Sequence, residues 1–306
     1  MCEKKGQSYS NDWNVLRHLF WDGKDSFGNI LKLDEAGIEC SLKRALKDFT
    51  ARTDKKQEDE QSASVNNMAD ALKEYQEELF AYFSDDAKGQ QEFDQWHHTM
   101  CMRFVKAIKE KGIRQNISYG KAQKILNMTF KNLYCLEDAK EKQTHFAFCH
   151  LALDSFILKW FRETVATEWF NYGKTRSEKI KISENGPIPN WSNLQFKDGS
   201  LSLLFDDYNT QTESRECDGK YHYMFFVTMI RAYIEKTDRY KGLTPFQAEF
   251  YVWMETQYEV AAGGLLKQGL CAALEGNAGV ITNNPTIKKQ NEEIKAMLDK
   301  LSKFYC

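Results

Sequence analysis

The sequence predicts a mainly α fold, and three observations support that prediction. Apolar residues recur at i, i+3 and i+4 over long stretches, which is the spacing of amphipathic helices. The first 186 residues contain no proline. Lys, Glu, Leu and Ala, which favour helices, are frequent in these proline-free stretches. We therefore expect a bundle of helices, with any sheet confined to a small hairpin near residues 191–205.

The N-terminal half is expected to be helical with one polar interruption. Residues 12–50 carry helical spacing on both sides of a turn at 23–29, and the periodicity resumes strongly at Met68. It continues to a Lys-Glu-Lys-Gly stop at residues 109–112, where basic residues of a last turn precede a glycine. The polar segment 52–67 is either a solvated linker or the exposed end of a helix.

The C-terminal half continues the helical pattern after Gly120, which predicts a short turn before a helix over about 122–136. A further helix should start at Asp154 or Ser155 and extend to residue 170. Residues 171–220 are the least helical, and helices resume at 221–233 and at Thr244-Pro245, an N-cap with proline at the first position. The last 20 residues read as one charged helix. We expect one large helical domain over residues 1–306, with two helical lobes around a cleft as the alternative.

Composition narrows the class of protein. The chain has 306 residues, 42% hydrophobic and 28% charged, which is the balance of a soluble globular protein. No run approaches the ~20 apolar residues of a membrane span, and the polar N-terminus does not resemble a signal peptide. The 8 cysteines lie far apart without a CxxC pair, which favours reduced thiols in a cytoplasmic protein. The net charge of −2 limits any nucleic-acid site to a local basic patch.

A metal or cofactor is not expected. His97, His98 and Cys101 place potential ligands within one helical turn, but zinc would need further ligands, and no second His/Cys cluster has matching spacing. The neighbouring Trp96 and Met100 are typical of an ordinary packing helix.

A basic stripe follows Gly120. Lys124 and Lys131 lie two turns apart on one face of the predicted helix, and Lys121 lies one turn before Lys124. A solvated helix face is the simplest interpretation of such a stripe. Met128 lies between the two lysines, however, and the opposite side already supplies a core stripe. The sequence therefore predicts a basic surface with some apolar character.

Asp154 is a lone acid between two apolar triplets, Leu-Ala-Leu at 151–153 and Phe-Ile-Leu at 156–158. A carboxylate among buried residues is costly unless it is paired, used as a cap or used in chemistry. One interpretation is that Asp154 caps the following helix, which contributes about 1 kcal/mol. The other is that it faces a catalytic group from elsewhere in the chain. The two interpretations are compatible.

Residues 113–131 and 150–160 together resemble the helix-hairpin-helix DNA glycosylases, nearest to their archaeal 8-oxoguanine glycosylase branch. Gln123-Lys124 and Lys131 resemble that branch's helix, which carries a reactive lysine and a second lysine seven residues on. The stretch Ala-Leu-Asp-Ser at 152–155 resembles its Pro-Ile-Asp-like stretch. The hairpin departs from the usual Leu-Pro-Gly-x-Gly, with Ile-Ser-Tyr-Gly at 117–120 in its place, and the chain lacks a cysteine cluster for an iron–sulfur centre.

The resemblance implies a chemistry for this pair. Lys124, its pKa lowered by a partly apolar site, would attack the sugar C1′ as a neutral amine and form a Schiff base. Asp154 would assist deprotonation of the lysine and stabilise the cationic sugar. Because Lys121 directly follows the turn glycine, it competes with Lys124 for the nucleophile's role.

The implied partner is double-stranded DNA with a modified base that is flipped out and stacked on aromatic side chains. The implied phosphate contacts are Ser118, Tyr119, Gly120, Lys121 and Lys131. The aromatic residues expected in the same cleft are Trp191, Tyr251 and Trp253. The alternative function is a non-catalytic helical protein that binds nucleic acid or another protein through the same basic helix.

Overall fold

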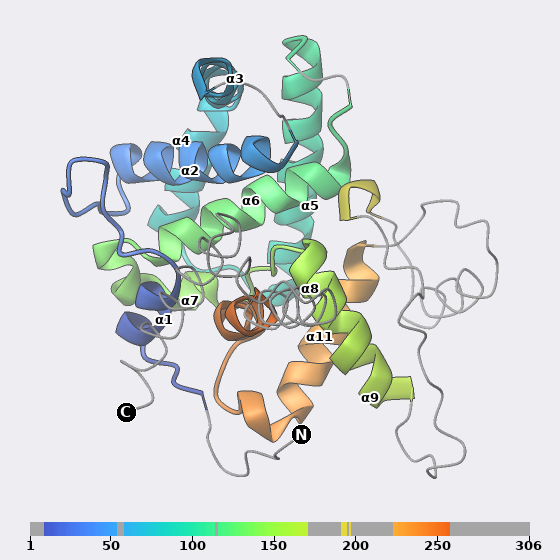
Figure 1. The fold of residues 1–306 in the computed structure, drawn as a ribbon. Coiled ribbons are helices and arrows are strands. Elements are labelled where there is room, and N and C mark those ends of the chain that lie inside the picture. The colour runs from blue at the N-terminus through green and yellow to red at the C-terminus, as the bar shows by residue number, and fades with distance from the viewer. Residues whose placement is uncertain are drawn as a thin grey trace, which may run out of the picture.

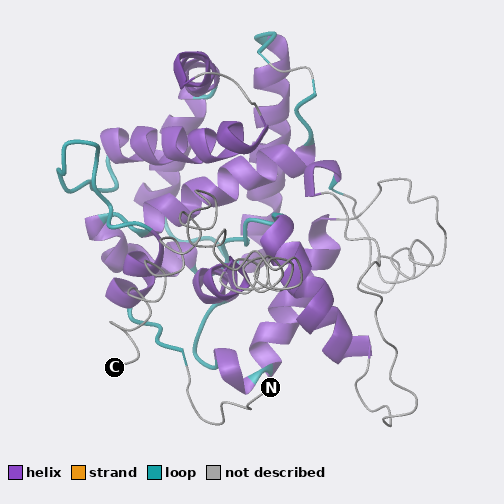
Figure 2. Cartoon of the chain, in the orientation of Figure 1, coloured by secondary structure: helices purple, strands orange, loops and turns teal. Residues whose placement is uncertain are grey.

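The computed structural model describes residues 9–53, 58–113, 116–170, 191–194, 196 and 223–257. Within these residues every regular element is helical and strands are absent, apart from an isolated bridge between Lys24 and Ile30 (Figure 2). The prediction of a mainly α fold is confirmed. In the described part of the chain, no helix is both long and apolar enough to cross a bilayer.

Helices of the first half lie around one central helix. The elements are α1 (Trp13–Phe20), α2 (Glu35–Thr53), α3 (Glu58–Ala71), α4 (Lys73–Ser84), α5 (Gln90–Glu110) and α6 (Tyr119–Tyr134). Figure 1 shows α6 crossing the middle of the molecule, with α2 packed along it. The polar segment 52–67 belongs to helices where it is described, because α2 ends at Thr53 and α3 starts at Glu58.

The second half consists of shorter helices. They are η1 (Glu137–Lys142), α7 (Gln143–Phe146), α8 (Ser155–Trp160), the π-helical η2 (Phe161–Ala166), α9 (Thr167–Phe170), η3 (Trp191–Asn193), α11 (Tyr223–Lys236), η4 (Asp238–Tyr240) and a helix over 245–257. Any sheet was expected to be confined to a hairpin near 191–205, and at 191–193 the chain makes a 3-10 turn instead of a strand. Residues 195 and 197–205, like the charged C-terminal helix, lie outside the described residues.

Two predicted helix starts are confirmed by their caps. Asp154 is the N-cap of α8, and its side chain accepts hydrogen bonds from two amides of the first turn. The Thr244 hydroxyl accepts from the Gln247 amide at 3.2 Å, while the Gln247 side chain accepts from the Thr244 amide at 3.0 Å. This reciprocal pair is a capping box, in which both residues satisfy amides that the helix itself leaves unbonded.

The turn predicted at Gly120 is wrong, because α6 begins earlier, at Tyr119, with Ser118 as its N-cap. Gly120 therefore lies in the first turn of the helix. Its lack of a side chain allows a close approach, since a Cβ atom there would lie 2.1 Å from the backbone oxygen of Trp191. The glycine serves helix packing and not a reversal of the chain.

Candidate active site around Lys124 and Asp154

The structure brings together the lysine and the aspartate that the sequence singled out. Nζ of Lys124, in α6, lies 3.7 Å from Oδ2 of Asp154, at the start of α8. Their side chains are 4% and 3% exposed, respectively. The expected convergence of the two side chains is therefore present, inside the protein and not on its surface.

The two oxygens of Asp154 have different partners. Oδ1 accepts hydrogen bonds from the amides of Phe156 at 2.9 Å and Ile157 at 3.1 Å, and so caps α8. Oδ2 faces the ammonium of Lys124. Capping and pairing thus coexist in one carboxylate, as the sequence allowed.

Trp191 covers the lysine. The centre of its ring lies 4.5 Å from Nζ of Lys124, within the range of a cation–π contact. Of the three aromatic residues expected here, Trp191 is therefore in place. Tyr251 instead stacks on Tyr9, with ring centres 4.2 Å apart, and Trp253 faces Lys131.

The start of α6 is covered as well, which corrects three of the expected phosphate contacts. The Ser118 hydroxyl donates to the backbone oxygen of Ser192, and Gly120 lies against the backbone of Trp191. The buried Tyr119 ring packs near the ring of Phe196, with centres 5.8 Å apart. Because Trp191, Ser192 and Phe196 pack against this turn, Tyr119 and Gly120 are buried and Ser118 is half-buried with its hydroxyl already bonded.

The expectation that Lys131 contacts DNA is also wrong. Its Nζ lies 3.0 Å from Oε1 of Glu249, and both side chains are 1% exposed. The rings that surround the ammonium at 4.6 to 5.1 Å are those of Phe20, Phe250 and Trp253. Lys121 is the one residue of α6 that is partly exposed, and its Nζ donates to the Asn116 backbone oxygen at 2.9 Å.

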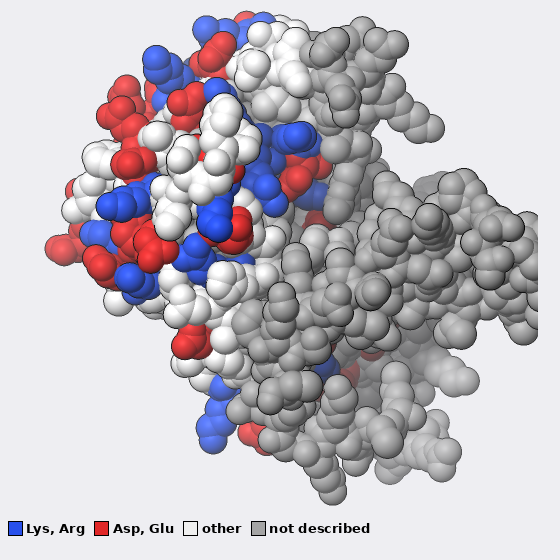
Figure 3. Space-filling view, turned by 60° about the vertical axis from the view of Figure 1, so that its left-hand side comes forward, with Lys and Arg blue, Asp and Glu red and all other residues white. Residues whose placement is uncertain are grey.

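The basic stripe is therefore not a surface patch. Its polar face is covered by residues 151–154, which supply backbone oxygens as partners, and by the helix over 245–257, which supplies the Glu249 carboxylate. On the face of the molecule shown in Figure 3, basic and acidic side chains are interspersed.

Sequence reasoning missed three residues that hold the segment before Asp154. Asn127 donates to the Leu151 oxygen at 2.8 Å, and Gln123 donates to the Leu153 oxygen at 2.9 Å. Glu249 accepts from the Ala152 amide at 3.0 Å.

A signal for Glu249 was available, because it is a lone acid that directly precedes the apolar run Phe-Tyr-Val-Trp at 250–253. Burial raises the pKa of Glu249 above its usual value, although the charge of Lys131 opposes the shift.

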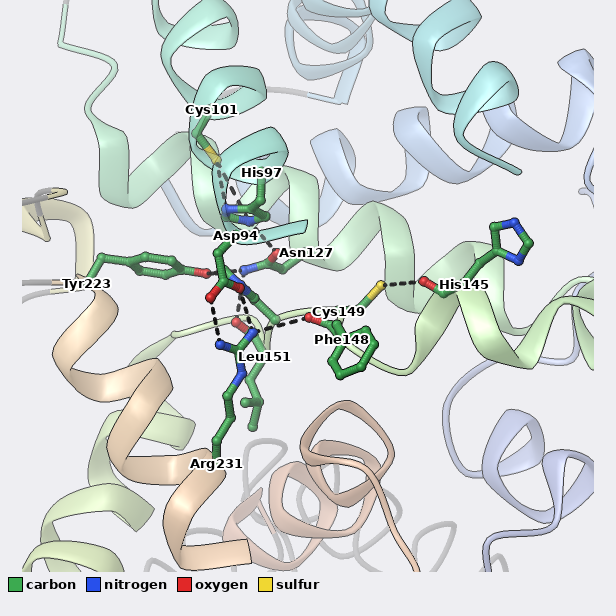
Figure 4. Close-up of polar contacts among 11 residues, drawn as sticks. Asp94, His97, Cys101, Asn127, His145, Phe148, Cys149, Leu151, Tyr223 and Arg231 are labelled. Carbon is green, nitrogen blue, oxygen red and sulfur yellow. Dashed lines mark hydrogen bonds and ion pairs between the residues drawn. The ribbon is translucent and has the colours of Figure 1, made fainter. Parts of the chain in front are cut away.

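Figure 4 shows a second polar network, whose members are mostly buried. The Asp94 carboxylate lies 2.7 Å from Nε2 of His150 and accepts two hydrogen bonds from Arg231, at 2.9 and 2.7 Å. Nδ1 of His150 lies 2.9 Å from the hydroxyl of Tyr223, which accepts from Asn127 at 2.9 Å. Asn127 thus connects this network to the segment before Asp154.

Burial controls the ionisation of this network. It lowers the pKa of His150 to about 4, although the hydrogen bond to Asp94 opposes the shift. The imidazole is therefore neutral at pH 7. Its partners assign the proton to Nε2, which donates to the carboxylate, while Nδ1 accepts from the Tyr223 hydroxyl. Burial also lowers the pKa of His97, whose Nε2 lies 2.8 Å from Oδ1 of Asn127.

The described part of the chain holds no group of three or more His, Cys, Asp or Glu side chains arranged for a metal. His97 and Cys101, which the sequence placed one turn apart, contact each other at 3.8 Å, and the ring of His98 stacks on Phe196 with centres 3.7 Å apart.

Comparisons with known proteins return no match: no family model, no curated protein and no solved structure is significantly similar to this chain. The resemblance to helix-hairpin-helix glycosylases therefore rests on the residues quoted above and on an all-helical fold.

Proposed function

We propose that this protein is a DNA glycosylase with lyase activity that excises a modified base through Lys124 and Asp154. The observation that supports the proposal is the buried contact of 3.7 Å between Nζ and Oδ2, formed by two residues that are far apart in the sequence. A nucleophilic lysine needs a neighbouring base and a site that excludes water, and this arrangement supplies both.

In the proposed reaction, Asp154 accepts the ammonium proton and the neutral amine of Lys124 attacks C1′ of the sugar. The C1′–N bond to the base breaks with its electron pair on the base, which takes the proton from Asp154 as it leaves and so restores the carboxylate. A C1′–Nζ bond forms, and transfer of a proton from Nζ to the ring oxygen O4′ opens the sugar ring and gives the protonated Schiff base. The positive charge that develops on the sugar is stabilised by the carboxylate in a medium of low dielectric. Because Trp191 covers the amine in this structure, the sugar reaches Lys124 after the indole has moved away.

Borohydride trapping tests the proposal, because reduction turns a Schiff base into a stable covalent adduct. The substrates are duplexes that each carry one modified base, 8-oxoguanine among them. We expect an adduct with the wild type and none with Lys124→Gln or Lys124→Arg. The arginine variant retains a positive charge opposite Asp154 but cannot form the Schiff base. Asp154→Asn retains a capping side chain and should lose adduct formation.

The matched control is Lys131→Arg, which changes the other buried lysine of the same helix that pairs with a carboxylate. It should still form the adduct, in proportion to its folded fraction. An adduct that persists in Lys124→Gln would assign the nucleophile to another amine, with Lys121 the first to test, and would overturn the role of Lys124. A wild type that forms no adduct with any duplex would favour the alternative of a non-catalytic binding protein.

A further inference from the structure

The segment before Asp154 has no regular secondary structure, and side chains of other elements bind its backbone. Residues 151–154 lie between α7 and α8. Three consecutive residues each have one backbone group bonded to a side chain of another helix: the Leu151 oxygen, the Ala152 amide and the Leu153 oxygen. A buried backbone group without a partner is costly, so these contacts set the path along which the chain reaches Asp154.

Gln123 is the member of this set that lies next to the lysine in the chain. It precedes Lys124 in α6, and its amide nitrogen donates at 2.9 Å to the oxygen of Leu153, the residue before Asp154. One turn of one helix therefore carries the amine and holds the backbone next to the carboxylate.

The orientation of the Gln123 amide is fixed. Its nitrogen makes a second hydrogen bond, to the Gly120 oxygen at 2.9 Å. Its oxygen lies 3.0 Å from the amide nitrogen of Asn127, whose two hydrogens face three acceptors. The side chain is fully buried. Both N–H groups are thus bonded to backbone oxygens, and rotation of the amide would place its own oxygen against those two acceptors.

We propose that Gln123 is a positioning residue that fixes Asp154 against Lys124. The inference rests on the proposed function for its effect on catalysis. Its structural part, the placement of Asp154 by the Gln123–Leu153 hydrogen bond, can be tested without any activity. Since a reacting group misplaced by about 1 Å can slow a reaction on the order of 10²-fold, loss of this bond should act on the rate and not on DNA binding.

The test compares Gln123→Met with Asn132→Leu. Asn132 is a matched control because it also lies buried in α6, and its amide donates at 2.9 Å to a backbone oxygen of another helix, that of Ser41. Each substitution removes the hydrogen bond and keeps the approximate volume. Adduct formation under single-turnover conditions, measured over a range of enzyme concentrations, separates the rate at saturation from the half-saturating concentration.

We expect Gln123→Met to lower the rate at saturation on the order of 10²-fold and to leave the half-saturating concentration unchanged. Asn132→Leu should change neither quantity once both are corrected for the folded fraction. An unchanged rate in Gln123→Met, or an equal loss in both variants, would overturn the proposal. If Gln123→Met does not fold, Gln123→Asn serves instead, because it retains a buried amide and withdraws it from Leu153.

Hydrogen exchange of the Phe156 and Ile157 amides, which Asp154 caps, provides a readout independent of activity. Gln123→Met should accelerate their exchange beyond the change in global stability, whereas Asn132→Leu should not. If the wild type forms no adduct, the proposed function fails, and exchange alone then decides the positioning role. Equal protection of these amides in the two variants would reject it.

Discussion

Each of two buried carboxylates of this protein divides its oxygens between a lysine and a backbone amide. Asp154 faces Lys124 and caps α8, while Glu249 faces Lys131 and accepts from Ala152. Burying an ion pair carries a desolvation cost that is repaid when the remaining lone pairs are also bonded. The same rule explains why a lone acid in an apolar run pointed correctly to a buried partner. For Glu249 the sequence did not indicate which residue is the partner, because Lys131 is remote from it in the chain.

His150 makes the stability of the fold sensitive to moderate acidity. Its pKa is lowered from 6.5 to about 4 in the folded protein, so the unfolded chain binds the proton more readily. The contribution of His150 to the free energy of unfolding is therefore fully present above pH 6.5 and is lost as the pH falls from 6.5 towards 4. The loss should be on the order of 3 kcal/mol, since one pKa unit corresponds to about 1.4 kcal/mol.

Chemical unfolding at a series of pH values between 7 and 4 checks this prediction. His150→Gln can still donate to Asp94 and accept from Tyr223, and it does not titrate, so its stability should fall less over this window. A remaining slope is expected from His97, whose pKa burial also lowers. A profile in His150→Gln as steep as that of the wild type would show that the imidazole does not control it.

At the scale of elements, the helices and several of their ends were predictable because local chemistry determines them. Apolar periodicity located α4 and α5, and a single polar residue before an apolar run located the starts at Asp154 and Thr244. Such signals lie within a few residues of the feature that they specify.

The exposure of α6 was not predictable in the same way. Its lysines and amides follow one face of the helix, which normally indicates solvent. In the structure this face is buried, because segments remote in the sequence provide a partner for each of Gln123, Lys124, Asn127 and Lys131. Periodicity shows which positions of a helix are polar, but it does not show whether those side chains contact water or a buried partner.

Gly120→Ala tests the contact between α6 and η3. Alanine favours the helix by about 1 kcal/mol, but its Cβ would lie 2.1 Å from the Trp191 oxygen. A backbone atom cannot yield as a flexible side chain does, so we expect η3 to leave the start of α6. Lys124 should then become accessible to reductive methylation, measured by mass spectrometry of the labelled peptide.

Two controls accompany this substitution. Lys131 should stay protected in the same sample, because its partners are Glu249 and rings outside η3. Gly89→Ala places a Cβ 3.7 Å from its nearest neighbour and should leave Lys124 protected. Continued protection of Lys124 in Gly120→Ala would mean that η3 does not shield it.

At the scale of the whole molecule, residues from both ends of the described chain meet. The Tyr9 hydroxyl contacts Glu255 and Arg239, and the Trp13 indole ties the same end to the central helix α6 by donating to the Tyr134 oxygen at 2.6 Å. One cluster of buried apolar residues includes members from α1 to the helix over 245–257. These contacts favour one cooperative body over two helical lobes that unfold separately.

Cooperativity can be measured by perturbing one end and observing the other. Leu16→Ala removes a fully buried side chain of α1, which should cost about 2–5 kcal/mol. If the described helices unfold together, the slowest-exchanging amides of α11 should lose the same free energy of protection, although α11 lies far from α1 in the sequence. Far-UV circular dichroism and tryptophan fluorescence should also report one coincident unfolding transition. Separate lobes predict instead that Leu16→Ala accelerates exchange near α1 and leaves α11 unchanged, because a lobe that folds alone would not sense a cavity in the other.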